Sequence, residues 1–184
     1  MVIADGKLAL LKKIKFIESE LPMKCPACEN ELTEHKVSGV KVNICSGSCG
    51  GLWFHLTQTR KIEHLKPGAG SALLHFELAD GVKTYRGAEH RCPQCKTTLL
   101  YRHFFSKKID TEVNQCSKCS GFWFDVGGLV KIMNSPQEKM KELREKYFTA
   151  IMNEKISGMN LENQDIAQAA AYITAIFNFL KPNY

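Results

Sequence analysis

Cys25-Pro-Ala-Cys28 and Cys45-Ser-Gly-Ser-Cys49, with sixteen residues between them, decide the fold of this 184-residue chain. A second quartet follows, in which twenty residues separate Cys92-Pro-Gln-Cys95 from Cys116-Ser-Lys-Cys119. Each Cys-x2-Cys turn places two sulfurs on one side of the backbone, and two such turns complete the tetrahedron that zinc accepts. The sequence therefore predicts two zinc sites, with ligands Cys25, Cys28, Cys45 and Cys49 in the first and Cys92, Cys95, Cys116 and Cys119 in the second.

Four sulfur ligands leave no open coordination position, so both predicted metals are structural. Small ribbons have little core of their own, and each metal is expected to supply on the order of 10 kcal/mol of folding free energy. Iron, or a redox-active Cys-Pro-x-Cys pair, is the alternative. No βαβ pattern surrounds either pair, and each pair has a partner pair at zinc spacing, which favours zinc. The Cys45-x3-Cys49 turn is one residue longer than usual.

Each quartet ends in a similar tail, Gly51-Leu52-Trp53-Phe54-His55 in one copy and Gly121-Phe122-Trp123-Phe124-Asp125 in the other. The offset is 67 residues at the first knuckle and 70 at the tryptophans, so the chain contains an internal duplication. We expect Trp53 and Trp123 to pack beneath the zinc turns as a small core rather than to stack on bases. Asp125 is expected to cap a following helix. His55, in the same position, either caps weakly or binds a partner.

The motif as a whole is Cys-Pro-x-Cys, a strand pair, then Cys-x2-Cys-x-Gly-x-Trp-Phe-Asp. It resembles the bacterial transcription-factor-IIB-type zinc-ribbon family, over residues 23–65 and 90–132 as two tandem copies. The second copy follows the motif closely, with Gly127-Gly128-Leu129 where the family commonly has Gly-Glu-Leu. The first copy has His55 at the aspartate position and lacks the Gly-Glu-Leu. The resemblance implies a zinc ribbon and does not by itself imply a role in transcription.

The predicted fold class is small α+β, with two zinc β-ribbons (rubredoxin-like knuckles), a bridging β-hairpin and a C-terminal α-helical hairpin. The stretch from Val37 to Val42 has β-branched residues around a Ser-Gly turn, and residues 99–105 and 109–113 match it in the second copy. The bridging hairpin pairs residues 73–78 with 82–86 across Asp80-Gly81. The expected segments are a helical N-terminal segment (1–21), ribbon 1 (22–65), the bridging hairpin (66–91), ribbon 2 (92–133) and the helical hairpin (134–184).

The two C-terminal helices are predicted from their caps. Ser135-Pro136-Gln137-Glu138 forms a capping box, and Gly158 ends the first helix. Asn160 offers an N-cap to a second helix that continues until Pro182. Its apolar stretch, residues 166–180, is shorter than the roughly 20 residues that span a bilayer. We therefore expect it to pack internally or to mediate self-association, with contact at a membrane interface as the alternative.

The charge and the N-terminus bear on partners and location. Eight thiolates and two Zn²⁺ change the formal charge by −4, from +6 to about +2, so the basic signal is weak. Lysines interrupt every apolar run in residues 1–16, and no signal-peptide core of about 7–15 residues exists there. We therefore expect a cytoplasmic protein, in which cysteines stay reduced and more often bind metal than form disulfides.

These patterns favour a non-enzymatic zinc-binding interaction module, a protein–protein adaptor that can act on transcription or nucleic-acid machinery. No Ser/His/Asp grouping or phosphate-binding glycine loop stands out, and His90 is predicted to be a surface residue. The first alternative is direct nucleic-acid binding through basic residues interleaved with aromatics on ribbon 2, although a solvated strand face is the favoured interpretation of them. The second is a thiol–disulfide redox protein using a Cys-Pro-x-Cys pair. The nucleic-acid candidates are Lys96, Arg102, Lys107 and Lys108.

Overall fold

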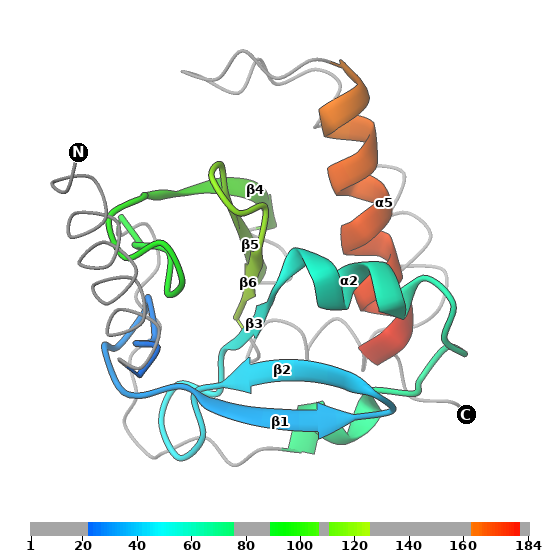
Figure 1. Ribbon diagram of the computed structural model, residues 1–184, viewed down its shortest axis with the longest axis horizontal. Helices are drawn as coiled ribbons and strands as arrows, with labels where there is room; N and C mark the ends of the chain where they lie inside the picture. The colour runs from blue at the N-terminus through cyan, green and yellow to red at the C-terminus, as the bar shows by residue number, and fades with distance from the viewer. Residues whose placement is uncertain (1–21, 76–88, 107–110, 126–162, 181–184) are drawn as a thin grey trace, which may run out of the picture.

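A computed structural model of the chain describes residues 22–75, 89–106, 111–125 and 163–180. Six strands form one antiparallel sheet in the order β1-β2-β3-β6-β5-β4, with helices beside it (Figure 1). No helix in these residues is long and apolar enough to cross a membrane. The elements are β1 (Thr33–Val37), β2 (Val40–Ile44), β3 (Leu52–Phe54), α2 (Leu56–Ile62), the 3₁₀ helix η1 (Ser71–His75), β4 (Leu100–Ser106), β5 (Thr111–Cys116), β6 (Phe122–Phe124) and α5 (Asn163–Leu180).

The two ribbons are joined edge to edge into this single sheet. Ribbon 1 supplies β1, β2 and β3, ribbon 2 supplies β4, β5 and β6, and β3 pairs with β6 in the middle. In that pair Trp53 lies directly opposite Trp123, while Leu52 faces Phe124 and Phe54 faces Phe122. Equivalent residues therefore meet about a local two-fold axis between the tryptophans. The duplication seen in the sequence is a pseudo-symmetric pair in space.

The two faces of the sheet have different partners. Successive side chains on a strand point to opposite faces, so Leu52 and Phe54 share one face with Phe122 and Phe124, and the tryptophans lie on the other. The first face joins the main apolar core with α2, η1 and α5. The second face joins a separate cluster that contains the cysteines. All six residues of β3 and β6 are buried, because both faces of the central strands are covered.

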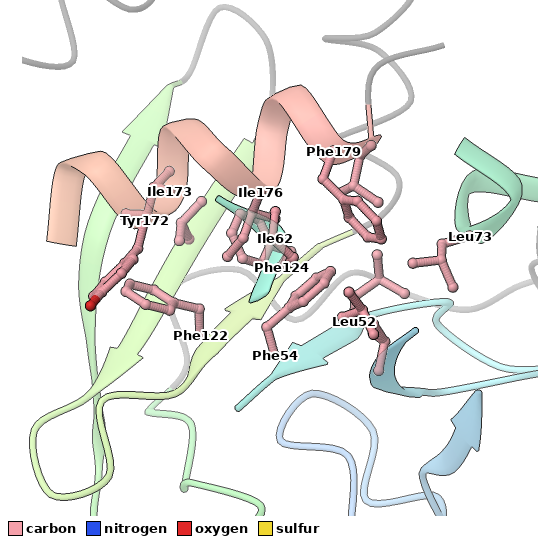
Figure 2. Close-up of a cluster of buried hydrophobic side chains, with 14 of the residues drawn as sticks. Leu52, Phe54, Ile62, Leu73, Phe122, Phe124, Tyr172, Ile173, Ile176 and Phe179 are labelled. Carbon is pink, nitrogen blue, oxygen red and sulfur yellow. The ribbon is translucent and has the colours of Figure 1, made fainter. Parts of the chain in front are cut away.

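The helix-side core is rich in aromatic rings that meet edge to face. The rings of Phe54 and Phe124 have centroids 5.6 Å apart, and α5 adds Phe177, 5.9 Å from Phe124, and Tyr172, 6.4 Å from Phe122. Figure 2 shows side chains of α5 over the phenylalanines of the central strands. Each fully buried large apolar side chain contributes about 1.5–3 kcal/mol. The apolar C-terminal helix therefore packs internally. This confirms the expectation of internal packing made from the sequence.

The segment after α2 fixes the C-terminal end of α5. The backbone N–H of Gly68 donates to the carbonyl of Asn178 at 2.9 Å, and that of Gly70 donates to Phe179 at 2.8 Å. Carbonyls in the last turn of a helix have no partner within the helix, so these bonds cap it from outside. A Cβ at Gly70 would lie 2.2 Å from the Phe179 ring, which explains the glycine there.

Local predictions had mixed outcomes. The Ser38-Gly39 turn between β1 and β2 is confirmed, with φ of 50° and 82°. The strand predicted over 73–78 is wrong at its start, because η1 occupies Ser71–His75 and Leu73 is buried in the helix-side core. The rest of that hairpin, the helical N-terminal segment and the helix begun by Ser135 lie outside the described residues. The short strands β3 and β6 were not predicted as strands.

Candidate metal centres and the interface between the ribbons

The first cysteine quartet converges on one point. The Sγ atoms of Cys25 and Cys49 are 3.4 Å apart, those of Cys28 and Cys45 are 3.4 Å apart, and those of Cys28 and Cys49 are 3.8 Å apart. All four sulfurs lie within 4.8 Å of one another, and none forms a disulfide. Three of the four residues are buried, with Cys28 half-buried.

The second quartet repeats this geometry with slightly longer spacings. The Sγ atoms of Cys92 and Cys119 are 3.6 Å apart and those of Cys95 and Cys116 are 3.9 Å apart. These four sulfurs also lie within 4.8 Å of one another, and all four cysteines are free. Here two residues, Cys95 and Cys119, are half-buried, so ribbon 2 exposes its site more than ribbon 1 does.

Both quartets fit a tetrahedral zinc ion. A Zn–S distance near 2.3 Å places tetrahedral sulfurs about 3.8 Å apart, and the observed separations lie around that value. An all-sulfur donor set with Cys-x2–3-Cys spacing is typical of structural zinc. The chain binds two structural zinc ions, as predicted from the eight cysteines.

The thiols of each quartet perturb one another strongly. A hydrogen bond from the Cys25 thiol lowers the pKa of Cys49 to about 6, and one from Cys92 lowers the pKa of Cys119 to about 5. The donors shift the opposite way, so the pKa values of Cys25 and Cys92 are raised. Burial raises the pKa of Cys45 to about 12. The thiols with raised pKa values lose their protons at neutral pH only beside a dication, which zinc supplies.

Matching backbone turns hold the first knuckle of each ribbon. The N–H of Glu29 donates to the Cys25 carbonyl at 2.9 Å, and that of Lys96 donates to Cys92 at 2.8 Å. Both residues have positive φ, 61° and 59°. The extra residue of the Cys45-x3-Cys49 turn is absorbed at Gly47, which has φ of 67° and open space around it. The longer spacing therefore leaves the first site intact.

The first site has a side-chain hydrogen bond that the second copy cannot make in the same way. Asn30 Nδ2 donates to Ser48 Oγ at 2.7 Å, so the Ser48 hydroxyl hydrogen is left for the Cys28 sulfur at 3.3 Å. The position of Ser48, just before the last ligand, is taken in ribbon 2 by Lys118, which is exposed. Hydrogen bonds to a thiolate stabilise it. The two sites therefore differ both in the solvent exposure of their cysteines and in the hydrogen bonds that these receive.

The tryptophans cross between the ribbons. A Cβ built on Gly51 would lie 2.1 Å from Cζ2 of Trp123, and one built on Gly121 would lie 2.3 Å from Cζ2 of Trp53. Each indole therefore packs on the glycine of the other copy. Trp53 is 1% exposed and Trp123 is 3% exposed, in the same cluster as cysteines of both sites. The predicted core role holds, but each ring covers the opposite ribbon, a reciprocity that sequence spacing does not reveal.

A histidine forms a second link between the copies. His90 is 6% exposed, and its Nδ1 lies 2.8 Å from the carbonyl of Pro26, inside the first knuckle of ribbon 1. A carbonyl only accepts, so Nδ1–H donates. The prediction of a surface residue is wrong because the partner is 64 residues away, and only the pairing of the two ribbons brings it near. The prediction considered only the position of His90 beside the first knuckle of its own ribbon.

His55 is a helix cap. Its Nδ1 accepts from the backbone N–H of Thr57 at 3.2 Å, and the Thr57 hydroxyl is 2.7 Å away, at the start of α2. This confirms the capping interpretation of His55. Asp125 occupies the same place after β6, but the segment that follows it lies outside the described residues.

The residues predicted for nucleic-acid binding are only partly described. Lys96 is exposed in the turn beside Cys95, and Arg102 is exposed in β4. Lys107 and Lys108 lie outside the described residues.

Two segments of the chain, residues 24–63 and 91–135, match the family model described as transcription factor zinc-finger. The segments coincide with the two ribbons, so they are tandem copies of this zinc ribbon, as the sequence motifs indicated. No curated protein and no solved structure matches the chain.

Proposed function

We propose that this chain, with its two tandem transcription-factor-type zinc ribbons, is a non-enzymatic adaptor that binds a protein partner in the cytoplasm. The observation that carries the proposal is the closure of both metal sites. Four sulfurs fill the coordination sphere of each zinc and leave no position for a substrate or a reactive water. The metals then have a structural role, which is to hold the sheet and its knuckles in a fixed shape.

The joining of the ribbons supports the same function. Reciprocal packing of the tryptophans on Gly121 and Gly51 makes the two metal sites parts of one rigid unit. A rigid surface loses little conformational entropy when it binds, which favours a partner of fixed geometry. We expect the partner to belong to the transcription or nucleic-acid machinery, because the ribbons match a family model described as transcription factor zinc-finger.

Direct nucleic-acid binding is a second candidate, favoured by the exposed cations Lys96 and Arg102 on ribbon 2. Against it, both tryptophans are buried and offer no ring on which a base could stack. A redox role for the Cys-Pro-x-Cys pairs is the weakest candidate, since every cysteine has a place in a metal site.

The test combines metal counting with capture of partners. Native mass spectrometry of protein purified without added metal is expected to give two zincs per chain. Photo-crosslinking of that protein in a cell extract is expected to capture a protein, and binding of a fluorescent (dT)15 oligonucleotide is expected to be weak. Tight oligonucleotide binding that falls steeply with added salt, through counterion release, with no protein captured, would refute the adaptor. Rapid alkylation of a cysteine pair in the two-zinc form would indicate redox chemistry instead.

A further inference from the structure

The two metal sites share one apolar cluster. This cluster, on the knuckle side of the sheet, contains Trp53, Trp123 and cysteines of both quartets. Its buried cysteines are Cys25, Cys45 and Cys49 of ribbon 1 and Cys92 and Cys116 of ribbon 2. Close-packed interiors transmit a displacement from one side chain to its neighbours. The surroundings of each metal site are therefore built in part by the ribbon that holds the other site.

In ribbon 1, the glycine under the indole belongs to a metal-binding turn. The Gly51 carbonyl accepts from the backbone N–H of Cys45 at 3.0 Å, and the Cys45 carbonyl accepts from that of Gly50 at 3.1 Å. These two bonds close the turn that carries the zinc ligands Cys45 and Cys49. Since Trp123 packs on Gly51, the zinc of ribbon 1 stabilises the surface on which a ring of ribbon 2 lies.

Ribbon 2 repeats this arrangement in the opposite direction. The Gly121 carbonyl accepts from the backbone N–H of Cys116 at 3.0 Å, and Trp53 packs on Gly121. The buried Nε1 of Trp53 has no hydrogen-bond partner among the described residues, so packing holds this ring in place. Each indole therefore loses its support when the turn of the other ribbon opens.

A hydrogen bond also joins the first knuckles of the two ribbons. The buried His90 stands two residues before the ligand Cys92. Its Nδ1–H donates to the carbonyl of Pro26 at 2.8 Å, in the turn between Cys25 and Cys28. Because a small ribbon folds around its metal, loss of either zinc frees one end of this bond. Both knuckles of each ribbon are thus in contact with the other copy.

We propose that the chain binds its two zinc ions cooperatively, each occupied site raising the zinc affinity of the other through the crossed tryptophan contacts. The effect is reciprocal, because a coupling free energy between two sites acts equally in both directions. We expect a coupling of about tenfold, which corresponds to about 1.4 kcal/mol. The one-zinc form is then suppressed, and the joined six-stranded sheet forms over a narrower range of free zinc than two independent ribbons would. This inference goes beyond the adaptor function and holds whichever partner binds.

The coupling is measured by zinc titrations of three chains in competition with a chromophoric chelator. Cys95→Ser/Cys119→Ser keeps only the site of ribbon 1, Cys28→Ser/Cys49→Ser keeps only that of ribbon 2, and the wild type has both. For independent sites, the two-zinc formation constant equals the product of the two single-site constants. We expect the wild-type constant to exceed this product at least about tenfold. A wild-type constant no larger than the product would overturn the proposal.

Native mass spectrometry of the wild type at stepwise free zinc tests the same point without substitutions. Two independent sites give a one-zinc form that reaches at least about half of the chains at its maximum, whereas tenfold coupling of equal sites lowers this maximum to about a quarter. The single-site constants give the maximum for uncoupled sites. A measured maximum well below that value supports the proposal, and one that matches it overturns the proposal.

Trp53→Phe/Trp123→Phe tests whether the indoles carry the coupling. Phenylalanine lacks the indole atoms that contact the two glycines, so the ratio of the two-zinc constant to the product should fall at least about threefold. Val40→Ala is the control, because it removes buried methyl groups at the turn end of β2, beyond the residues that pair with β3. It should weaken zinc binding to ribbon 1 and leave this ratio unchanged.

Two results with these variants would overturn the tryptophan route and with it the proposal. One is a ratio in Trp53→Phe/Trp123→Phe equal to that of the wild type. The other is an equal loss in the tryptophan variant and in Val40→Ala, which would make the ratio a measure of general stability. A tenfold coupling changes equilibrium affinities, so the ribbon with the more exposed cysteines still loses its zinc first to a chelator.

Discussion

Gly51→Ala tests the interlocking of the two ribbons. A Cβ at residue 51 would lie 2.1 Å from Cζ2 and 2.3 Å from Cη2 of Trp123, whereas ordinary contact begins at 3.4 Å. The indole or the strand must therefore shift by about 1.3 Å in a close-packed interior. Gly51 is not among the residues with positive φ, so backbone strain adds nothing to this cost. We expect a loss of about 3 kcal/mol, the upper end for an overpacked core.

The assay is urea unfolding of the zinc-loaded protein at fixed free zinc, followed by tryptophan fluorescence and circular dichroism. Gly47→Ala is the matched control, because a Cβ there meets nothing within 4 Å. Its φ of 67° alone should cost about 1–2 kcal/mol. The difference between the stability losses of Gly51→Ala and Gly47→Ala separates the effect of steric overlap from that of backbone strain.

Double mutants identify which ring Gly51 meets. Trp123→Phe removes the atoms that clash, so Gly51→Ala should cost less than about 1 kcal/mol in that background and its full amount in a Trp53→Phe background. If Trp53→Phe rather than Trp123→Phe lowers the stability cost of Gly51→Ala, the reciprocal packing of the ribbons is refuted. An equal cost of Gly51→Ala in both backgrounds would refute it too.

Three further predictions concern single contacts. His90→Leu removes the Nδ1–H donor to Pro26 and should cost about 1–3 kcal/mol in urea unfolding, with His90→Asn recovering part of it; no loss would mean that the link is not formed in solution. His55→Ala should cost about 1 kcal/mol by removing the cap of α2, while His55→Asp, an anion at a helix N-terminus, should be at least as stable as wild type. A chelator should remove the zinc of ribbon 2 first, because Cys119 is half-buried where Cys49 is 8% exposed; native mass spectrometry after alkylation would locate the loss, and simultaneous release from both sites would contradict this order.

The metal sites could be predicted from sequence because their information is local. Two cysteines three residues apart can bind one ion whatever surrounds them, since the turn itself sets the direction of both sulfurs. The β1–β2 hairpin and α5 were predictable for the same reason. Ser38-Gly39 favours a turn with positive φ, and the apolar residues of α5 recur at helical spacing.

The edge-to-edge joining was not predictable from such signals. Leu52–Phe54 and Phe122–Phe124 are three-residue strands, too short for a periodic pattern to identify. The start of the bridging hairpin was mistaken because Leu73 to Leu78 has a strand-like composition, whereas the segment after α2 follows the end of α5. Sequence reasoning also considered the surroundings of His90 within ribbon 2 alone, and so it missed the contact with Pro26 of ribbon 1.

By itself, the sequence determined the eight metal ligands, the duplication and the amphipathic character of α5, because each depends on spacings within a turn or a helix. The tertiary structure alone decided that β3 pairs with β6 and that each tryptophan covers the other copy's glycine. These features join residues about 70 positions apart. They arise because neither small ribbon can bury its own indole and central strand, and pairing the two copies covers both.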